Sequence, residues 1–300
     1  MKNLFICYTP FHLNLSYSII KQMSYENNIL VFLPSIQNNK NNKYFENSKG
    51  HYEQFFTKII KKNHISDYIY LNKISDNIQD ADKIFVGNLK TIYSRILISK
   101  INYNEISTFD DGVGHFYKSS YFFSFDEKII GRILLRSTFH YSNLFSTIKS
   151  HFSLYFNNFM NHKLILIEYR SVMNVEIMKD KGTNISLFLS RPFYEEGIMP
   201  RKKVNRLYDK IIKTNKINYI QIHPREKKNN TILPILDDSL IVEDLVLSGS
   251  ISKLIGFSTT SLITAKILNS KIECIYYYLS HDSKLDDLFA KLEVKRIKIS

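Results

Sequence analysis

Short apolar runs alternate with longer helix-like segments along both halves of the 300-residue chain. An apolar run of about five residues fits a buried strand, and a longer segment between two such runs fits the helix that connects parallel strands. The alternation therefore predicts an α/β fold in which helices cover parallel sheets. In the first half we expect strands at 3–8, 28–33, 67–71, 83–86 and 105–109, with helices at 11–23, 52–62 and 89–100.

The alternation stops at an aromatic segment, 117–160, and then resumes. Because 300 residues can supply two hydrophobic cores, we predict an N-terminal domain, 1–160, and a C-terminal domain, 161–300, with the boundary somewhere in 155–182. The aromatic segment is expected either to connect the domains as helix or to rest on a membrane or an acceptor. In the second half we expect strands at 163–168, 185–189, 218–223, 239–242, 253–257 and 271–277, with helices at 201–216 and 259–268.

Basic residues exceed acidic ones by 41 to 28, which gives a formal charge of +13. Such an excess predicts an anionic partner: nucleic acid, anionic lipid headgroups or nucleotide phosphates. The heavy use of Lys, Asn and Ile throughout the chain offers a purely compositional explanation. The Asn- and Lys-rich stretch 35–50 is expected to be a solvated loop.

The two cysteines, Cys7 and Cys274, lie in separate apolar runs. They are expected to be buried, and two thiols cannot supply the four ligands of a structural zinc site. No apolar stretch reaches the roughly 18 to 20 residues of a membrane helix. These features predict a cytoplasmic protein and leave open peripheral contact with the inner face of the cytoplasmic membrane.

Asp110 and Asp111 follow the predicted strand 105–109, and Gly112 comes next. Parallel sheets bind their ligands beyond the carboxyl ends of their strands. A carboxylate there can act as general base on a hydroxyl. The alternative is an ordinary Asp-Asp-Gly turn.

A second candidate site is His223-Pro224-Arg225, which ends the predicted strand 218–223. Pro224 stops the strand and leaves the imidazole and the guanidinium near its end. Arg225 can hold a phosphate, and His223 can donate a proton to a departing one. A histidine used only in packing is the alternative.

Four hydroxyl side chains, Ser258, Thr259, Thr260 and Ser261, lie between the predicted strand 253–257 and the helix that follows it. With the free N–H groups of a helix N-terminus they form a site for an anion, although capping alone needs only one of them. Glu243 and Asp244 close another predicted strand, where a carboxylate can accept hydrogen bonds from ribose.

Several common motifs are missing from the sequence. It contains no G-x-x-x-x-G-K-[ST] and no G-x-G-x-x-G, which argues against a P-loop NTPase and a conventional dinucleotide enzyme. Asp80-Ala81-Asp82 precedes a predicted strand, away from the ligand edge. No histidines show metal-ligand spacing, so we predict no obligatory metal and no cofactor.

Taken in order, the segments "NLFICYT", "TFDDGVG", "HPRE", "IVED" and "FSTTSL" resemble the bacterial sialyltransferases of glycosyltransferase family 52, which act on lipooligosaccharide and capsular polysaccharide. The resemblance implies a GT-B fold with two Rossmann-like domains facing across a cleft. It also implies a CMP-sialic acid donor, a galactose-terminated glycan acceptor and metal-independent inverting transfer. By the same resemblance, His223 would face the CMP phosphate, Ser258 to Ser261 would hold it, and Glu243 would contact the ribose.

At the catalytic base this sequence departs from the family pattern. Some family members place an aspartate just after a Ser-Pro in the turn that opens the second domain, where this chain has Phe193 after Pro192. Glu195 or Glu196 could replace it only if the loop shifts. Related families use an acidic-acidic-Gly motif, so we expect Asp111 to be the base, with Asp110 beside it.

Two other functions stay open from the sequence. A GT-B transferase with a UDP donor is the first, and a basic nucleic-acid-binding protein is the second. The second is disfavoured because the basic residues are spread along the chain rather than gathered in one region. Assembly as a homodimer is also left open.

Overall fold

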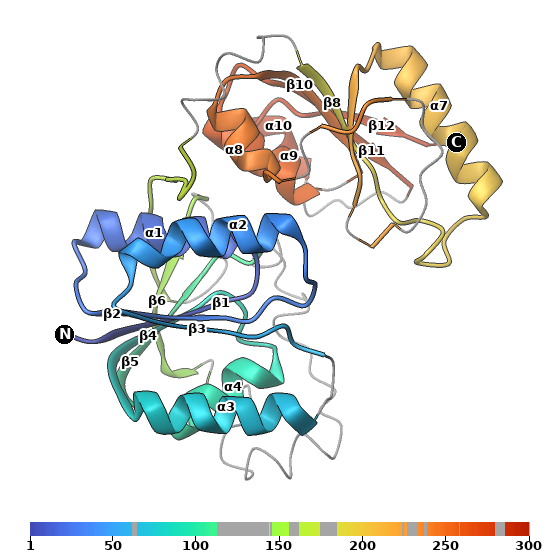
Figure 1. The fold of residues 1–300 in the computed structure, drawn as a ribbon. Coiled ribbons are helices and arrows are strands. Elements are labelled where there is room, and N and C mark those ends of the chain that lie inside the picture. Colours follow the sequence, from blue (N-terminus) through green and yellow to red (C-terminus); the bar gives the residue numbers. More distant parts are fainter. Residues whose placement is uncertain are drawn as a thin grey trace. The chain divides into compact units, whose positions relative to one another are not determined.

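The computed structural model describes residues 1–61, 65–112, 144, 146–155, 162–174, 185–223, 225–226, 233–236, 239–257, 259–279 and 286–299. The chain divides into two compact units, Met1–Met173 and Asn174–Ser300. Each is built on one parallel sheet, which confirms the predicted α/β class (Figure 1).

The first unit has a seven-stranded sheet in the order β3-β2-β1-β4-β5-β6-β7. Helices α1 and α2 lie on one face of the sheet, and α3 and α4 lie on the other (Figure 1). This double cover explains why β1 and β2 are buried at every residue. The elements are β1 (Asn3–Cys7), α1 (Pro10–Met23), β2 (Asn28–Phe32), α2 (Asn39–Ser48), a 3₁₀ turn (Lys49–His51), β3 (Gln54–Thr57), α3 (Ile65–Ile78), β4 (Asp80–Val86), α4 (Ile92–Lys100), β5 (Asn102–Phe109), β6 (Ile148–Ser153) and β7 (Lys163–Leu166).

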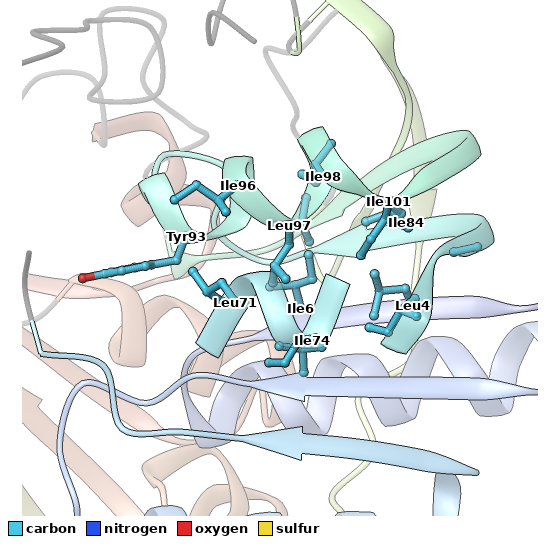
Figure 2. Close-up of a cluster of buried hydrophobic side chains, with 14 of the residues drawn as sticks. Leu4, Ile6, Leu71, Ile74, Ile84, Tyr93, Ile96, Leu97, Ile98 and Ile101 are labelled. Carbon is cyan, nitrogen blue, oxygen red and sulfur yellow. The ribbon is translucent and has the colours of Figure 1, made fainter. Parts of the chain in front are cut away.

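The two faces of this sheet carry different cores. Leu4 and Ile6 of β1 join an aliphatic cluster with α3 and α4, which Figure 2 shows in detail. Phe5 points to the opposite face, where its ring stacks on Phe85 with centroids 4.6 Å apart. The alternation follows from the two-residue period of a strand. Each fully buried aliphatic side chain contributes about 1.5–3 kcal/mol to stability.

The second unit has a five-stranded sheet in the order β12-β11-β10-β8-β9. The face covered by α7 has an aromatic core, in which the Phe257 ring contacts Phe188, Phe193 and Tyr208. The elements are β8 (Ile185–Leu189), α7 (Arg201–Asn215), β9 (Tyr219–Gln221), α8 (Val242–Leu247), β10 (Ile251–Gly256), α9 (Thr259–Leu268), β11 (Glu273–Tyr278), α10 (Asp286–Lys291) and β12 (Lys295–Lys298).

Four predicted elements differ from the structure. The predicted helix 52–62 contains strand β3, the predicted strand 67–71 lies inside α3, and the predicted strand 239–242 leads into α8. The expected loop 35–50 contains α2, which is capped by Asn38 and anchored by buried Tyr44 and Phe45. Short apolar runs fit strand and helix equally well, and tertiary packing decides between them.

The boundary between the units falls between Met173 and Asn174, thirteen residues beyond the predicted 160/161 and inside the expected range 155–182. Strand β7, expected in the second domain, pairs with β6 in the first sheet. The chain then runs along α1, where Ser18 Oγ accepts a hydrogen bond from Arg170 N at 2.8 Å and Asn14 Oδ1 accepts one from Val172 N at 3.0 Å. These bonds attach residues 167–173 to the first unit.

The aromatic segment 117–160 does not form one helical connector. Part of it is strand β6, which pairs with β5. Residues 113–143, 145 and 156–161 lie outside the described part of the chain.

Both cysteines are buried, as expected. Burial raises the pKa of the Cys7 thiol to about 12, and it raises the pKa of Cys274 to about 12 as well.

Candidate active site

Asp111 lies just past the carboxyl end of β5, where Gly112 turns the chain with a φ of 78°. Its side chain is 28% exposed. Asp111 Oδ1 lies 3.0 Å from His12 Nε2, and its Oδ2 accepts a hydrogen bond from Asn88 Nδ2. One carboxylate is thus fixed by two side chains while still facing solvent.

His12 is held on both ring nitrogens. Its Nδ1 accepts a hydrogen bond from Tyr8 N at 3.2 Å, so the neutral ring carries its proton on Nε2 and donates it to Asp111. The side chain is only 1% exposed and lies in the first turn of α1. Thr9 caps this helix by accepting a hydrogen bond from His12 N.

Gly87 provides the space for the imidazole. A Cβ at this position would lie 2.5 Å from His12 Nδ1 and 2.7 Å from Phe109 Cε2, closer than such atoms approach. Only glycine fits here without displacing the two rings.

Asn88 begins a loop that is tied to β1 and α4. Its Oδ1 accepts a hydrogen bond from Lys90 N at 3.0 Å, which orients the amide toward Asp111. Thr91 caps α4, and its hydroxyl and that of Ser94 bond to Tyr8 Oη. Burial lowers the pKa of Lys90 to about 8.

These residues come from three neighbouring strands. Because β1, β4 and β5 are adjacent and parallel, their carboxyl ends meet at one edge of the sheet. Tyr8, Asn88 and Asp111 follow these three strands in turn. Side chains at this edge can therefore hold the Asp111 carboxylate in a fixed orientation toward a substrate hydroxyl.

Asp110 does not share the exposure of Asp111. It is fully buried, its Oδ1 lies 3.0 Å from His151 Nε2, and its Oδ2 accepts a hydrogen bond from Leu154 N at 2.8 Å. His151 in turn bonds through Nδ1 to Thr108 Oγ1. Asp110 therefore joins β5 to β6 and does not present its carboxylate to a ligand.

In the second unit, His223 follows β9 at the carboxyl edge of the sheet. Its backbone N–H donates to Ser190 Oγ at 2.8 Å, and Ser190 in turn donates to Glu226 Oε2. Ser190 follows the adjacent strand β8. The hydroxyl thus links the ends of two neighbouring strands.

The imidazole of His223 is half-buried. Its Nδ1 accepts a hydrogen bond from Arg225 N at 3.2 Å, which leaves the proton of the neutral ring on Nε2. Burial lowers the pKa of His223, and the positive charges of Arg225 and Arg191 lower it further. The neutral ring can donate one hydrogen bond through Nε2 to a phosphate.

The pKa of Glu226 is shifted upward, whereas that of His223 is shifted downward. Burial raises the pKa of its carboxyl, and the nearby negative charge of Glu195 adds to this, although the Ser190 hydrogen bond lowers it. The protonated form is therefore favoured more than in an ordinary glutamate.

Glu195 lies in the turn after β8, and Arg201 Nη2 donates to its carboxylate at 3.5 Å. Tyr208 of α7 fixes this turn by bonding to both the N–H and the carbonyl of Arg191. Phe193, at the position where the resemblance implies an aspartate, is 1% exposed and belongs to the aromatic core. A carboxylate could not replace this side chain without losing that packing.

Of the remaining predicted donor-binding residues, Thr260 and Ser261 lie near the same edge. Strand β10 is adjacent to β8, and α9 begins just after it, with Thr260 and Ser261 half-buried in its first turn. Ser258, Pro224 and the side chain of Thr259 lie outside what the structure describes.

Glu243 and Asp244 were expected at the end of a strand, which is wrong. They lie in the first turn of α8, where negative charge complements the helix dipole. Both are buried, at 7% and 0% exposure.

Four residues of these sites were not predicted as functional: His12, Asn88, Ser190 and Glu226. The Thr-Pro pair before His12 signals a helix start, and Glu226 completes the "HPRE" segment. Nothing in the sequence marks Asn88 or Ser190.

Two general features of the described residues bear on the chemistry. Within these residues, no group of three or more His, Cys, Asp or Glu side chains is placed to hold a metal ion. No helix among them has the length and apolar character to cross a bilayer.

Comparison with known proteins identifies relatives of similar length. The chain is 27% identical over 254 residues to the CMP-N-acetylneuraminate:beta-galactoside alpha-2,3-sialyltransferase of Pasteurella multocida, covering 82% of this chain and 80% of that protein. It is 25% identical over 205 residues to the N-acetyllactosaminide alpha-2,3-sialyltransferase of Haemophilus influenzae, covering 66% of this chain and 64% of that one.

A solved UDP-glucosyltransferase from Polygonum tinctorium covers the whole of this chain with a TM-score of 0.55, at 10% sequence identity and 85% coverage of that structure. This likeness concerns the fold alone, and it confirms the GT-B class with two parallel-sheet units. The family model described as glycosyltransferase family 52 matches residues 25–278. The chain belongs to glycosyltransferase family 52 and is a glycosyltransferase.

Proposed function

We propose that this enzyme transfers sialic acid from CMP-sialic acid to the terminal galactose of a lipooligosaccharide or capsular glycan, forming an α-2,3 linkage. The names of the Pasteurella and Haemophilus relatives both specify α-2,3 sialyltransfer, which supports the donor, the acceptor sugar and the linkage. Family membership supports the reaction type.

The observation that carries the proposal is the oriented carboxylate of Asp111. It is partly exposed at a sheet edge, and His12 and Asn88 hold its two oxygens. A base must present a fixed lone pair to the hydroxyl that it deprotonates, and this arrangement supports such a role.

In the proposed reaction, the galactose hydroxyl gives its proton to Asp111 while its oxygen attacks the anomeric carbon of sialic acid. The bond between that carbon and the phosphate oxygen breaks, and CMP leaves with the electron pair. The attack comes from the face opposite CMP, so the configuration inverts. No metal or cofactor takes part in these steps.

The departing phosphate is assigned to the second unit. The Nε2–H of His223 would donate to it, and Arg225 would supply positive charge. The first turn of α9, with Thr260 and Ser261, would add backbone N–H donors. Glu243 is retained as the candidate contact for ribose.

The donor can be tested by thermal shift with CMP, CDP and UDP. A nucleotide at about a hundred times its dissociation constant should stabilise the protein by roughly 2.7 kcal/mol. Stabilisation by the two cytidine nucleotides and not by UDP supports the proposal. Stabilisation by UDP alone would make the enzyme a UDP-sugar transferase instead.

Transfer itself is measured with CMP-sialic acid and lactose, and the product linkage is read by NMR. An α-2,3 product formed at the same rate with and without EDTA is expected. A rate that collapses in EDTA and returns with a divalent ion would contradict the metal-free reaction.

A further inference from the structure

A groove on the second unit shares no lining residue with the residues assigned to transfer. It runs between α7 and the strands β11 and β12, with a cavity of about 440 Å³. Helix α10 packs on the opposite face of the sheet, because Phe289 stacks on Tyr276 while Tyr277 belongs to the face covered by α7. Helix α7 thus forms one wall of the groove, and the strands form its floor.

The floor of the groove is apolar. Tyr277 and Leu279 contribute from β11 and the residue after it, and Ile297 and Ile299 from β12 and its end. Leu207 of α7 completes the apolar lining. Except for buried Tyr277, these side chains are only half-buried, so the groove keeps apolar surface in contact with water.

The rim of the groove is basic. Lys203, Arg206 and Lys210 follow one another at helical spacing along α7, and Lys298 lies on β12. All four are exposed, and none forms an ion pair with any described residue. The lining includes no acidic side chain among the residues that the structure describes. The groove therefore presents uncompensated positive charge above an apolar floor.

We propose that this groove binds an anionic membrane lipid and attaches the enzyme to a membrane surface. The acyl chain would lie on Leu207, Leu279 and Ile299, and the headgroup phosphate would lie among the cations of α7. Lysine and arginine suit this position because their stems cover apolar surface while their charges reach the headgroup. The inference does not depend on the donor or the acceptor.

Vesicle flotation of the full chain tests the charged part of the proposal. We compare vesicles of phosphatidylcholine alone with vesicles that contain 30% phosphatidylglycerol, a fraction of about one lipid in three chosen to give an anionic surface. The wild-type chain should float only with the anionic vesicles. The triple variant Lys203→Gln, Arg206→Gln, Lys210→Gln should partition roughly a hundredfold less strongly, since each basic residue near such a surface adds about fivefold.

The matched control removes the same number of charges elsewhere, with Lys73→Gln, Lys100→Gln and Lys291→Gln at exposed positions. Its partitioning should fall less than about threefold, because these side chains lie outside the groove. Both triple variants should sialylate lactose at the wild-type rate. A groove variant that no longer floats but still transfers sialic acid at the wild-type rate would support lipid binding independently of the proposed function.

The apolar part is tested by fluorescence, since the chain contains no tryptophan. Ile299→Trp places a single reporter on the floor of the groove, and Ile69→Trp, at a 64% exposed position in the first unit, is its control. Anionic vesicles with brominated acyl chains should quench the Ile299→Trp emission and leave Ile69→Trp unchanged.

Three outcomes overturn the proposal. The wild-type chain fails to float with anionic vesicles, or the groove variant floats as well as its control variant. Alternatively, an oligonucleotide binds with the same charge dependence while brominated chains leave Ile299→Trp unquenched, which would make the groove a nucleic-acid surface.

Discussion

His12 and His223 both follow the carboxyl end of a parallel strand, yet the protein holds them in opposite ways. His12 is 1% exposed, and its two ring nitrogens are engaged by Tyr8 and Asp111. His223 is half-buried, with Nδ1 engaged by the Arg225 N–H. Its Nε2 has no hydrogen-bond partner among the described residues.

The difference separates two uses of the same side chain. A buried imidazole with both nitrogens engaged cannot reach a substrate, so His12 acts by orienting the carboxylate that can. An imidazole with one open N–H can donate to a ligand directly, as we propose for His223. Each of the following predictions tests one side of this comparison.

The largest expected effect is that of Asp111→Asn. An amide cannot take up the proton of the acceptor, so kcat should fall by about 10²- to 10⁴-fold. The oxygen of the introduced amide can still accept the His12 hydrogen bond, but its NH2 group then faces the Asn88 Nδ2 donor, so a modest fall in melting temperature is expected as well. The measurements are initial rates with CMP-sialic acid and lactose, and thermal unfolding. If Asp111→Asn and His223→Ala both transfer sialic acid at nearly the wild-type rate, the proposed catalytic roles are wrong.

The second prediction concerns His223→Ala, which removes the open N–H donor. Loss of one donor to developing charge should lower kcat by about 10²- to 10³-fold and weaken stabilisation by CMP. His51→Ala serves as the control, because His51 is another half-buried histidine whose pKa is lowered by burial. Equal losses in the two variants would mean that any histidine replacement harms the enzyme.

The third prediction disturbs His12 without changing it. Gly87→Ala places a methyl group 2.5 Å from His12 Nδ1, so the ring must move or the strand must shift. We expect a loss of about 1–3 kcal/mol of unfolding free energy and a lower kcat with little change in KM. Gly50→Ala is the matched control, since nothing lies within 4 Å of the added atom. A Gly87→Ala enzyme with wild-type stability and kcat would show that His12 is not confined.

The smallest expected effect is that of Glu226→Gln. Because the folded pKa of Glu226 is raised, mainly by burial, this carboxyl loses stabilising free energy as pH rises through that pKa. Glutamine carries no charge and can still accept the Ser190 hydrogen bond. The variant should therefore melt at a higher temperature than the wild type at pH 8, and the difference should be smaller at pH 5. The corresponding gain in unfolding free energy should be less than about 1 kcal/mol. A gain that is larger at pH 5 would contradict the direction of the shift.

Much of the fold follows from local patterns in the sequence. Nearly continuous apolar runs such as 3–8 and 185–189 became central strands, because a parallel sheet buries both faces. Asp111 and His223 could be placed at strand ends because each follows an apolar run that marks a buried strand. The exceptions are amphipathic pieces such as 52–62, whose aromatic pair Phe55 and Phe56 lies on an edge strand.

The contacts around Asp111 could not be predicted from the sequence. His12 and Asp111 are 99 residues apart, and they meet because β4 enters the sheet between β1 and β5. Strand order depends on how crossover helices pack, which no local pattern records. For the same reason β7 was assigned to the wrong unit, although its residues were correctly predicted as a strand.

Burial of the two native thiols has a practical consequence. Cys7 lies in the first unit and Cys274 in the second, each with a thiol pKa of about 12. The thiolate that reacts with maleimides is scarce at neutral pH, so the wild-type chain should resist labelling. New cysteines at exposed Lys73 and Lys298 would then carry a donor and an acceptor dye, one on each unit. Energy transfer between them then measures whether CMP changes the distance between the two labelled positions, with every native cysteine kept.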